Sequence, residues 1–305
     1  MIKKLLLTLA LILSTSHSQA LENWYGYERQ EIDNHVIHIV TMSPAMYKAY
    51  LVRADNKSGR ETVESMAKKH HAEIAINGGF FYITAKNNGS PSGTLIINGH
   101  KYALKKNAKV PLVILENEKL SIVHDYSQKY LKDGLSAVSG IPFLVKNGIV
   151  DKKALSKKKP FYAQHARTAI GTKKDGTIVI VVAEHRYEKD IYSMSLADVQ
   201  SLLQEQSDGL LKNYKHKKVD EITISELKEI LKNSFTGTIS GLTMLELANL
   251  MKKIGCISAI NLDGGGSSTL WIKGKVINVT TGDNEENLGQ KVQRTVSDAI
   301  IFKRK

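Results

Sequence analysis

The stretch LTMLELANLMKKIGCISAINLDGGGSSTLWI, residues 242–272, predicts a helix, a strand, a polar loop and a second strand in direct succession. Thr243 and Glu246 form the T-x-x-E pattern of a capping box, and apolar residues then recur at helical spacing. Gly255 stands where a helix stop is expected. The apolar run that follows predicts a buried strand ending at Asp263. A helix followed at once by a buried strand indicates a mixed α/β domain.

Four other segments have apolar or alternating residues on both sides of Asn-Gly, Asp-Gly or Lys-Gly. They are TLIINGHKY, FLVKNGIV, IGTKKDGTIVIVV and LWIKGKVINV. Two-residue turns with positive φ favour Asn-Gly and Asp-Gly, so these segments predict β-hairpins. Residues 103–123 add further strand with a turn near Asn117. We therefore expect one large mixed β-sheet with several hairpins, flanked by helices.

Helical patterns occupy a smaller part of the chain. ETVESMAKKHH, residues 61–71, predicts an amphipathic helix that leads into the strand AEIAIN. Residues 187–238 are rich in lysine and glutamate and contain further helical patterns, so they predict a helical insertion.

The first twenty residues, MIKKLLLTLALILSTSHSQA, differ in composition from the rest. Two lysines, a short apolar run and a small-x-small exit are the layout of a secretory signal peptide. The apolar run is shorter than the roughly 20 residues that span a bilayer. A disordered or buried N-terminal segment is the alternative. The expected organisation is a signal peptide at 1–20 and one domain at 21–305, secreted or periplasmic and without a stable membrane span.

Charge and cysteine content limit the partners and the chemistry. The 305 residues carry a formal charge of +13, which favours anionic partners such as phosphate esters and acidic glycans. The lysine runs lack the interleaved aromatic residues of single-strand binders, so nucleic acid is not expected. Cys256 is the only cysteine, and its apolar surroundings predict a buried, inert thiol.

The loop after the buried strand is the first candidate site. Asp263 stands at the strand end, and exposed backbone amides and hydroxyls beside it suit an anion. The residues concerned are Gly264, Gly265, Gly266, Ser267, Ser268 and Thr269. A mobile glycine hairpin, with Asp263 satisfying turn amides, is the alternative.

A second apolar strand ends in the same way, at Asn77, Gly78 and Gly79. Two such strand ends indicate a shared cleft. Arg167 and Arg294 each stand just before an apolar strand, and arginine suits bidentate phosphate recognition. Glu184 stands at the far end of the hairpin that begins near Arg167.

Several motifs together resemble the phosphodiester glycosidase family. They are INGGFF, HARTAIGTKKDGTIVIVV, residues 241–278 and RTVSDAII, and the resemblance extends from Ile74 to Phe302 in the same order. Two departures concern the substrate. Ala166 stands where the family usually has proline, and Ala183 to Arg186 replace an Asp-Gly-Arg motif.

The resemblance implies a hydrolase that cleaves the anomeric C–O bond of a sugar-1-phosphodiester and releases a phosphate monoester. Asp263 is then the expected nucleophile or general base, with Glu184 as the second candidate. Asn77 is expected to position the sugar or the attacking water. The arginines and the residues of both glycine loops are expected to hold the phosphate.

Two other functions remain open at this stage. One is a non-catalytic glycan-binding or envelope-assembly protein, and the other is a phosphodiesterase acting at phosphorus. No cofactor is required by the sequence. A hard divalent cation is a candidate ligand of Asp263 and the neighbouring hydroxyls.

Overall fold

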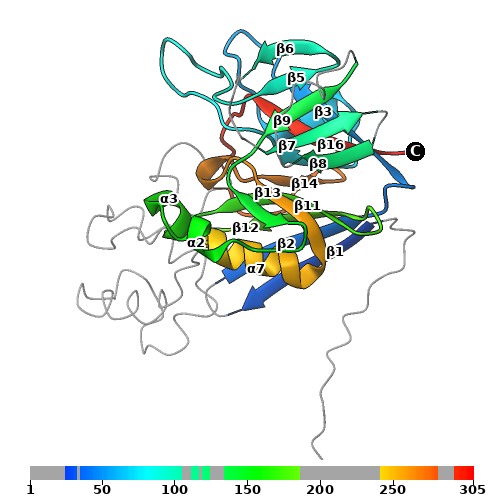
Figure 1. The fold of residues 1–305 in the computed structure, drawn as a ribbon. Coiled ribbons are helices and arrows are strands. Elements are labelled where there is room, and N and C mark those ends of the chain that lie inside the picture. The colour runs from blue at the N-terminus through cyan, green and yellow to red at the C-terminus, as the bar shows by residue number, and fades with distance from the viewer. Residues whose placement is uncertain are drawn as a thin grey trace, which may run out of the picture.

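The computed structural model describes residues 25–32, 35–104, 111–116, 119–123, 134–185, 241–280 and 292–305. The predicted signal peptide and the predicted helical insertion at 187–238 lie outside the described residues. Within the described ranges, strands dominate, and they form three stacked sheets (Figure 1).

The first sheet has six strands in the order β1-β2-β12-β11-β13-β10. Their bounds are Tyr25–Ile32 (β1), His35–Met42 (β2), Ile178–Ala183 (β12), Arg167–Lys173 (β11), Cys256–Asn261 (β13) and Phe143–Lys146 (β10). The sheet brings the first residues of β11 to the same side as the last residues of β12 and β13, because β11 is antiparallel to both of them.

The second sheet has the order β15-β14-β4-β16-β3. The bounds are Lys275–Val276 (β15), Leu270–Ile272 (β14), Ile74–Asn77 (β4), Asp298–Arg304 (β16) and Tyr47–Arg53 (β3). The third sheet has the order β6-β5-β9-β7-β8. Its strands are His100–Ala103 (β6), Leu95–Ile97 (β5), Ser136–Ser139 (β9), Leu112–Glu116 (β7) and Lys119–Val123 (β8).

The expected α/β class fits broadly, because the chain has both strands and helices, but the prediction of one large mixed sheet is wrong. The described strands form three sheets, and every ladder between them is antiparallel. Hairpin turns join neighbouring strands directly and so favour antiparallel pairs, whereas parallel pairs need long crossovers.

The main core lies where the three sheets face one another. Ile178, Ile180 and Val182 of β12 point into this core, whereas Val179 and Val181 point to the opposite face of the sheet. This alternation is the period of two that strands impose. Each fully buried aliphatic side chain contributes about 1.5–3 kcal/mol of hydrophobic stabilisation.

Helices cover the outer faces of two sheets. Helix α7, Met244–Ile254, packs with α2 (Lys152–Leu155) and α3 (Lys159–Tyr162) on the first sheet (Figure 1). Helix α1, Val63–Lys69, covers the second sheet. The capping box of α7 is present, and Gly255 adopts the left-handed conformation with φ of 102°. The two predicted helices that fall within the described residues are confirmed, although the described helices are few and small.

The Asn-Gly turns are confirmed as well. Asn98 and Gly99, between β5 and β6, both have positive φ, as do Asn147 and Gly148 after β10. This is the conformation that the two-residue hairpin turn requires. No helix among the described residues is long and apolar enough to cross a membrane.

Candidate functional site

Two strand ends that are far apart in the sequence meet at Asn77. Its side-chain Nδ2 donates to the backbone oxygen of Asp263 at 2.8 Å. Its Oδ1 accepts from the Thr168 hydroxyl at 2.8 Å and from the Thr269 amide at 3.2 Å. Asn77 is fully buried, so these bonds compensate its desolvation. The two strand ends therefore lie together, as expected. Asn77 links the end of β4 with the start of β11 and with the residue region that follows β13.

Asp263 lies at this junction, and the residue is half-buried. Its Oδ1 accepts from the Gly264 amide at 2.9 Å, and its own amide donates to Gly78 at 3.1 Å. Burial raises the pKa of Asp263 to about 6. The hydrogen bonds from Ser267 and Gly264 and the positive charge of Arg294 oppose that rise. The carboxyl group therefore titrates near neutral pH, in the range useful to an acid–base or nucleophilic group.

Ser267 connects Asp263 with Arg294. The Ser267 hydroxyl hydrogen-bonds the Asp263 carboxylate, and it accepts from Arg294 Nη1 at 3.3 Å. A serine hydroxyl has one proton to donate, and here that proton goes to the carboxylate. Ser267 thus orients the acid and the guanidinium relative to each other, and its contact with phosphate stays a prediction.

The glycine loop is a short 3₁₀ turn, Gly265–Ser267 (η5), rather than an open array of amides. The Gly264 amide donates to Asp263, and the Gly265 amide donates to the Ala166 oxygen at 2.8 Å. A side chain at Gly264 would lie 2.8 Å from that same oxygen. Gly265 has φ of +58° and open space around its Cα. Two of the three predicted anion-binding amides are therefore already used to shape the loop.

The other loop residues are buried. Thr269 donates its hydroxyl to the Ser267 oxygen at 3.2 Å. The Ser268 hydroxyl is buried without a hydrogen-bond partner among the described residues. Asn278 binds the Ser268 oxygen and the Leu270 amide, which fixes the exit of the loop into β14.

Glu184 lies at the end of β12 and is 2% exposed. Its Oε1 hydrogen-bonds His38 Nε2 at 2.8 Å and the Val279 amide at 2.8 Å. The Tyr27 hydroxyl lies 2.9 Å from the other ring nitrogen of His38. His38 lies on β2, a strand that the sequence patterns did not predict. These contacts make Glu184 a buried structural carboxylate that joins β2, β12 and the segment after β15.

Arg167 starts β11 and is 5% exposed. Its Nε donates to the Leu242 oxygen at 2.9 Å and its Nη2 to the Ala163 oxygen at 2.8 Å. Its backbone lies beside Gly264, but these bonds anchor the guanidinium to the chain entering α7. Burial, followed by the charge of Arg167 among other causes, lowers the pKa of both His165 and His185.

A second buried carboxyl group, Asp298, lies beside the site and was not singled out from the sequence. Its Oδ1 accepts from the Gly79 amide at 2.8 Å, and its Oδ2 accepts from the Ser297 hydroxyl. Burial raises its pKa to about 6, and the negative charge of Asp263 adds to that rise. A Cβ atom at Gly78 would lie 2.0 Å from Asp298 Oδ1, so this glycine permits the close approach. The available signal was a Ser-Asp pair at the start of an apolar strand.

The described residues hold no group of three His, Cys, Asp or Glu side chains that could bind a metal ion. The candidate site consists of Asp263, Ser267 and Arg294, supported by Asn77 and Asp298. It combines one carboxylate with one cationic donor.

A family model described as phosphodiester glycosidase matches residues 70–210 and 222–303. The chain belongs to the phosphodiester glycosidase family. The match includes every residue of the candidate site.

Two curated relatives are uncharacterised proteins. One, from Rickettsia conorii, is 35% identical over 145 residues, which cover 46% of this chain and 48% of that protein. The other, YomE from the SPbeta prophage of Bacillus subtilis, is 23% identical over 256 residues, or 80% of this chain and 30% of that protein. The chain thus spans about half or less of the length of these relatives.

Solved structures show the same fold. The catalytic domain of zebrafish N-acetylglucosamine-1-phosphodiester α-N-acetylglucosaminidase, auto-inhibited by its pro-peptide, has a TM-score of 0.60 at 18% identity. The similarity covers 94% of this chain and 84% of that one. A putative exported protein from Burkholderia pseudomallei has a TM-score of 0.57 at 14% identity, covering 88% and 74%. The phosphodiester glycosidase fold is therefore shared across distant sequences.

Proposed function

We propose that the chain hydrolyses a sugar-1-phosphodiester by cleaving the anomeric C–O bond, releasing the sugar and a phosphate monoester. The observation that carries this proposal is the linked set of Asp263, Ser267 and Arg294 in a phosphodiester glycosidase domain. This set places a carboxylate, which can act on the sugar, beside a guanidinium, which can bind the phosphate.

The charges of the reaction match those of the site. Cleavage of the anomeric bond develops positive charge on the sugar ring and negative charge on the departing phosphate. The Asp263 carboxylate stabilises the former, whether it attacks the anomeric carbon itself or activates a water. Arg294 stabilises the latter, because a guanidinium offers several donors in a fork that fits phosphate oxygens.

The supporting residues hold this arrangement before the substrate arrives. Asn77 fixes the backbone of Asp263, and Ser267 fixes its carboxylate relative to Arg294. Preorganised charges of this kind contribute to catalysis because they need no rearrangement during the reaction. Arg167 is buried with its backbone beside Gly264, and Glu184 is buried at the end of the neighbouring strand β12.

Hydrolysis of an alkyl sugar-1-phosphate in ¹⁸O-labelled water tests the proposal. We expect the label in the released sugar, because the water oxygen takes the place of the phosphate oxygen on the anomeric carbon. Label in the phosphate would overturn the proposal in favour of chemistry at phosphorus. Absence of turnover, with saccharide affinity that survives Asp263→Ala, would overturn it in favour of a glycan-binding protein.

We further propose that the protein acts after export, either secreted or in a periplasm, on an envelope glycan. The basic, apolar and small-residue pattern of residues 1–20 supports export. Cell fractionation followed by N-terminal sequencing tests this proposal. The expected mature protein is outside the cytoplasm and begins near Leu21, whereas an intact N-terminus in the cytoplasm would contradict export.

A further inference from the structure

A cavity of about 500 Å³ lies at the edge of the second sheet, where β3 faces the third sheet. Its volume is within the range of small-molecule sites, about 300–1,000 Å³. The residues that give it its chemistry are Tyr50, Arg53, Asp55, Asn98, Tyr102 and Lys303. None of them belongs to the candidate active site described above.

Arg53 is the central group of this cavity. The centre of its guanidinium lies 4.6 Å from the centroid of the Tyr102 ring. Its Nε is buried and donates to no acceptor within the described parts of the chain. A buried donor without a partner costs free energy, so its presence in a cavity indicates that a ligand supplies the acceptor. Stacking on an aromatic ring leaves the in-plane donors of a guanidinium available for an anion.

The cavity is positively charged overall. Lys303 lies over the Tyr50 ring with its Nζ 5.3 Å from the centroid. Neither Arg53 nor Lys303 forms an ion pair with a carboxylate in the regions that the structure describes. The pKa of His70, which also lines the cavity, is lowered first by burial and then by the positive charges of Lys303 and Lys69.

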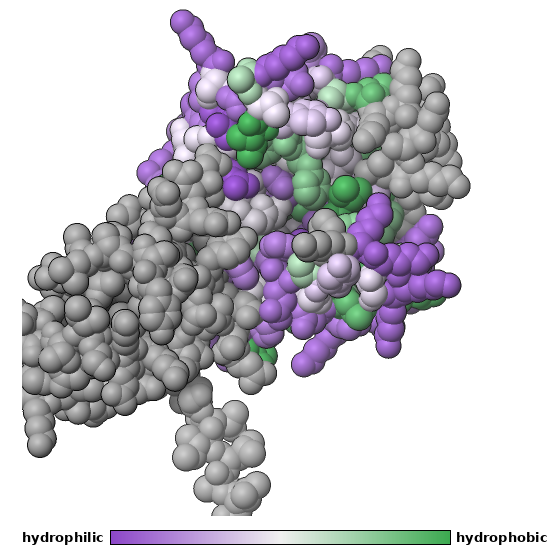
Figure 2. Space-filling model, turned by 90° about the vertical axis from the view of Figure 1, so that its left-hand side faces the viewer, coloured by the Kyte–Doolittle hydropathy of each residue, from purple (hydrophilic) through white to green (hydrophobic). Residues whose placement is uncertain are grey.

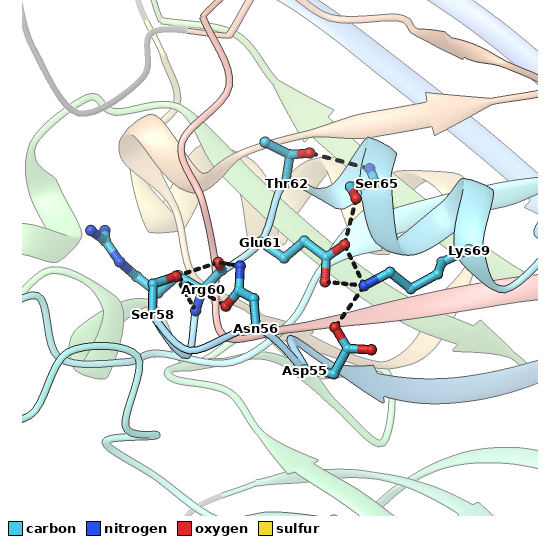
Figure 3. Close-up of polar contacts among 8 residues, drawn as sticks. All are labelled: Asp55, Asn56, Ser58, Arg60, Glu61, Thr62, Ser65 and Lys69. Carbon is cyan, nitrogen blue, oxygen red and sulfur yellow. Dashed lines mark hydrogen bonds and ion pairs between the residues drawn. The ribbon is translucent and has the colours of Figure 1, made fainter.

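The one carboxylate of the lining is balanced by a lysine outside it. Lys69 Nζ lies 2.6 Å from Asp55 Oδ1 and 2.9 Å from Glu61 Oε1, and Ser65 hydrogen-bonds the same Glu61 (Figure 3). Asp55 is therefore held at the rim with its charge compensated, while its second oxygen suits a sugar hydroxyl. The charge of Lys303 remains for an anionic ligand. The charge of Arg53 also acts on its ladder partner Asp298, where it opposes the rise in pKa, but no carboxylate of the described residues forms an ion pair with Arg53.

The lining also suits a saccharide. Tyr102 is 42% exposed, and aromatic rings with adjacent polar groups present one apolar and one hydrogen-bonding surface. Asn98 adds an amide at the tip of the β5–β6 turn. We propose that this cavity binds an anionic saccharide, with Arg53 contacting its acidic group.

This site adjoins the candidate active site through the second sheet. Arg53 on β3 is the ladder partner of Asp298 on β16, and Asp298 accepts a hydrogen bond from Gly79. The saccharide class of the ligand rests on the proposed function, whereas the anion site rests on the Arg53 cavity alone.

Calorimetric titration of the full chain with methyl β-D-glucuronide tests the inference. Methyl β-D-glucoside, which lacks the carboxylate, is the uncharged control, and inorganic phosphate is the control for an anion without a sugar. We expect the glucuronide to bind, the glucoside to bind at least about tenfold more weakly, and Arg53→Gln to weaken glucuronide binding by at least about tenfold. Arg29→Gln, at an exposed arginine paired with Glu31 on β1, is the matched control and should leave binding unchanged.

Three results would overturn the inference: no glucuronide binding, equal binding of the glucoside, or unchanged affinity in Arg53→Gln. Phosphate binding as tight as glucuronide would reduce the cavity to a bare-anion site and overturn the saccharide class. If Arg53→Gln does not fold, Tyr102→Ala removes the stacking partner and should weaken binding. Hydrolysis of the sugar-1-phosphodiester without glucuronide binding would contradict only this second site. Glucuronide binding without hydrolysis would contradict only the proposed function.

Discussion

Asp263 and Glu184 are carboxylates at two strand ends of one sheet, separated by the single strand β11, and they have different surroundings. Asp263 remains partly exposed, and its partners are a glycine amide, a serine hydroxyl and a nearby arginine. Glu184 is closed off by His38 and the Val279 amide. The comparison teaches that a strand-end acid becomes a candidate for chemistry only where the packing leaves it a path to a substrate.

The two arginines repeat this contrast. Arg294 contacts the loop that carries Asp263, whereas Arg167 donates to the carbonyl oxygens of Leu242 and Ala163. Figure 2 shows hydrophilic residues over much of the coloured surface, with hydrophobic residues in patches between them. Arg167 therefore anchors backbone segments, whereas Arg294 is the arginine that we propose contacts the substrate.

The largest expected effect is the loss of activity in Asp263→Asn. Replacing the carboxylate with an amide removes the negative charge that faces the anomeric carbon, so kcat should fall by about 10²–10⁴-fold. Initial rates on a sugar-1-phosphodiester measure this loss. Glu184→Gln is the matched control, and a loss as large in that variant would break the comparison between the two carboxylates.

The next largest effects should distinguish the two arginines, because substitution of Arg294 should change the kinetics and substitution of Arg167 should change the stability. Arg294→Lys should lower kcat/KM by about 10–150-fold, because a charge-assisted hydrogen bond to phosphate contributes about 1.5–3 kcal/mol. Arg167→Lys should instead lower the free energy of unfolding by about 1–3 kcal/mol, since two backbone oxygens lose their fitted donors. Steady-state kinetics and urea unfolding of both variants measure these effects. A loss of stability in Arg294→Lys together with a loss of kcat/KM in Arg167→Lys would contradict the assignment.

Glu184 offers a smaller test of its structural role. The hydrogen bonds with His38 and with the Val279 amide both end on Oε1, so Gln can accept these two with its carbonyl oxygen, whereas Ala cannot. We expect Glu184→Ala to lower the free energy of unfolding by about 1–3 kcal/mol more than Glu184→Gln does. Chemical denaturation measures the difference, and equal stability of the two variants would argue against the His38–Glu184–Val279 link.

The pH dependence should sharpen the assignment of Asp263. Its folded-state pKa of about 6 is above the ordinary value, so the protonated form favours folding. Its contribution to stability is therefore present below about pH 4 and lost as the pH rises through about 6. Activity that needs the carboxylate should rise over the same interval.

Asp263→Asn should accordingly gain stability relative to the unchanged chain at pH 8 and lose that gain toward pH 4. Unfolding and rate profiles from pH 4 to 8 measure the two trends. Activity that falls between pH 5 and 7 would contradict a working carboxylate with this pKa.

The sequence by itself determined the local elements. The capping box and Gly255 specify α7, the Asn-Gly turns specify hairpins, and alternating apolar residues specify strand faces. It also identified the strand-end loops of Asn77 and Asp263. These features depend on turn preferences and periodicities that act over a few residues.

Only the tertiary structure decided which residues surround Asp263. Ser267 meets Arg294 because β16 pairs with β4 in the second sheet, and Asp298 reaches Gly79 through the same ladder. The division into three sheets, the enclosure of Glu184 and the anchoring of Arg167 likewise depend on strand pairing between distant segments. Burial and hydrogen-bond partners are properties of the packed molecule, so local sequence patterns carry little information about them.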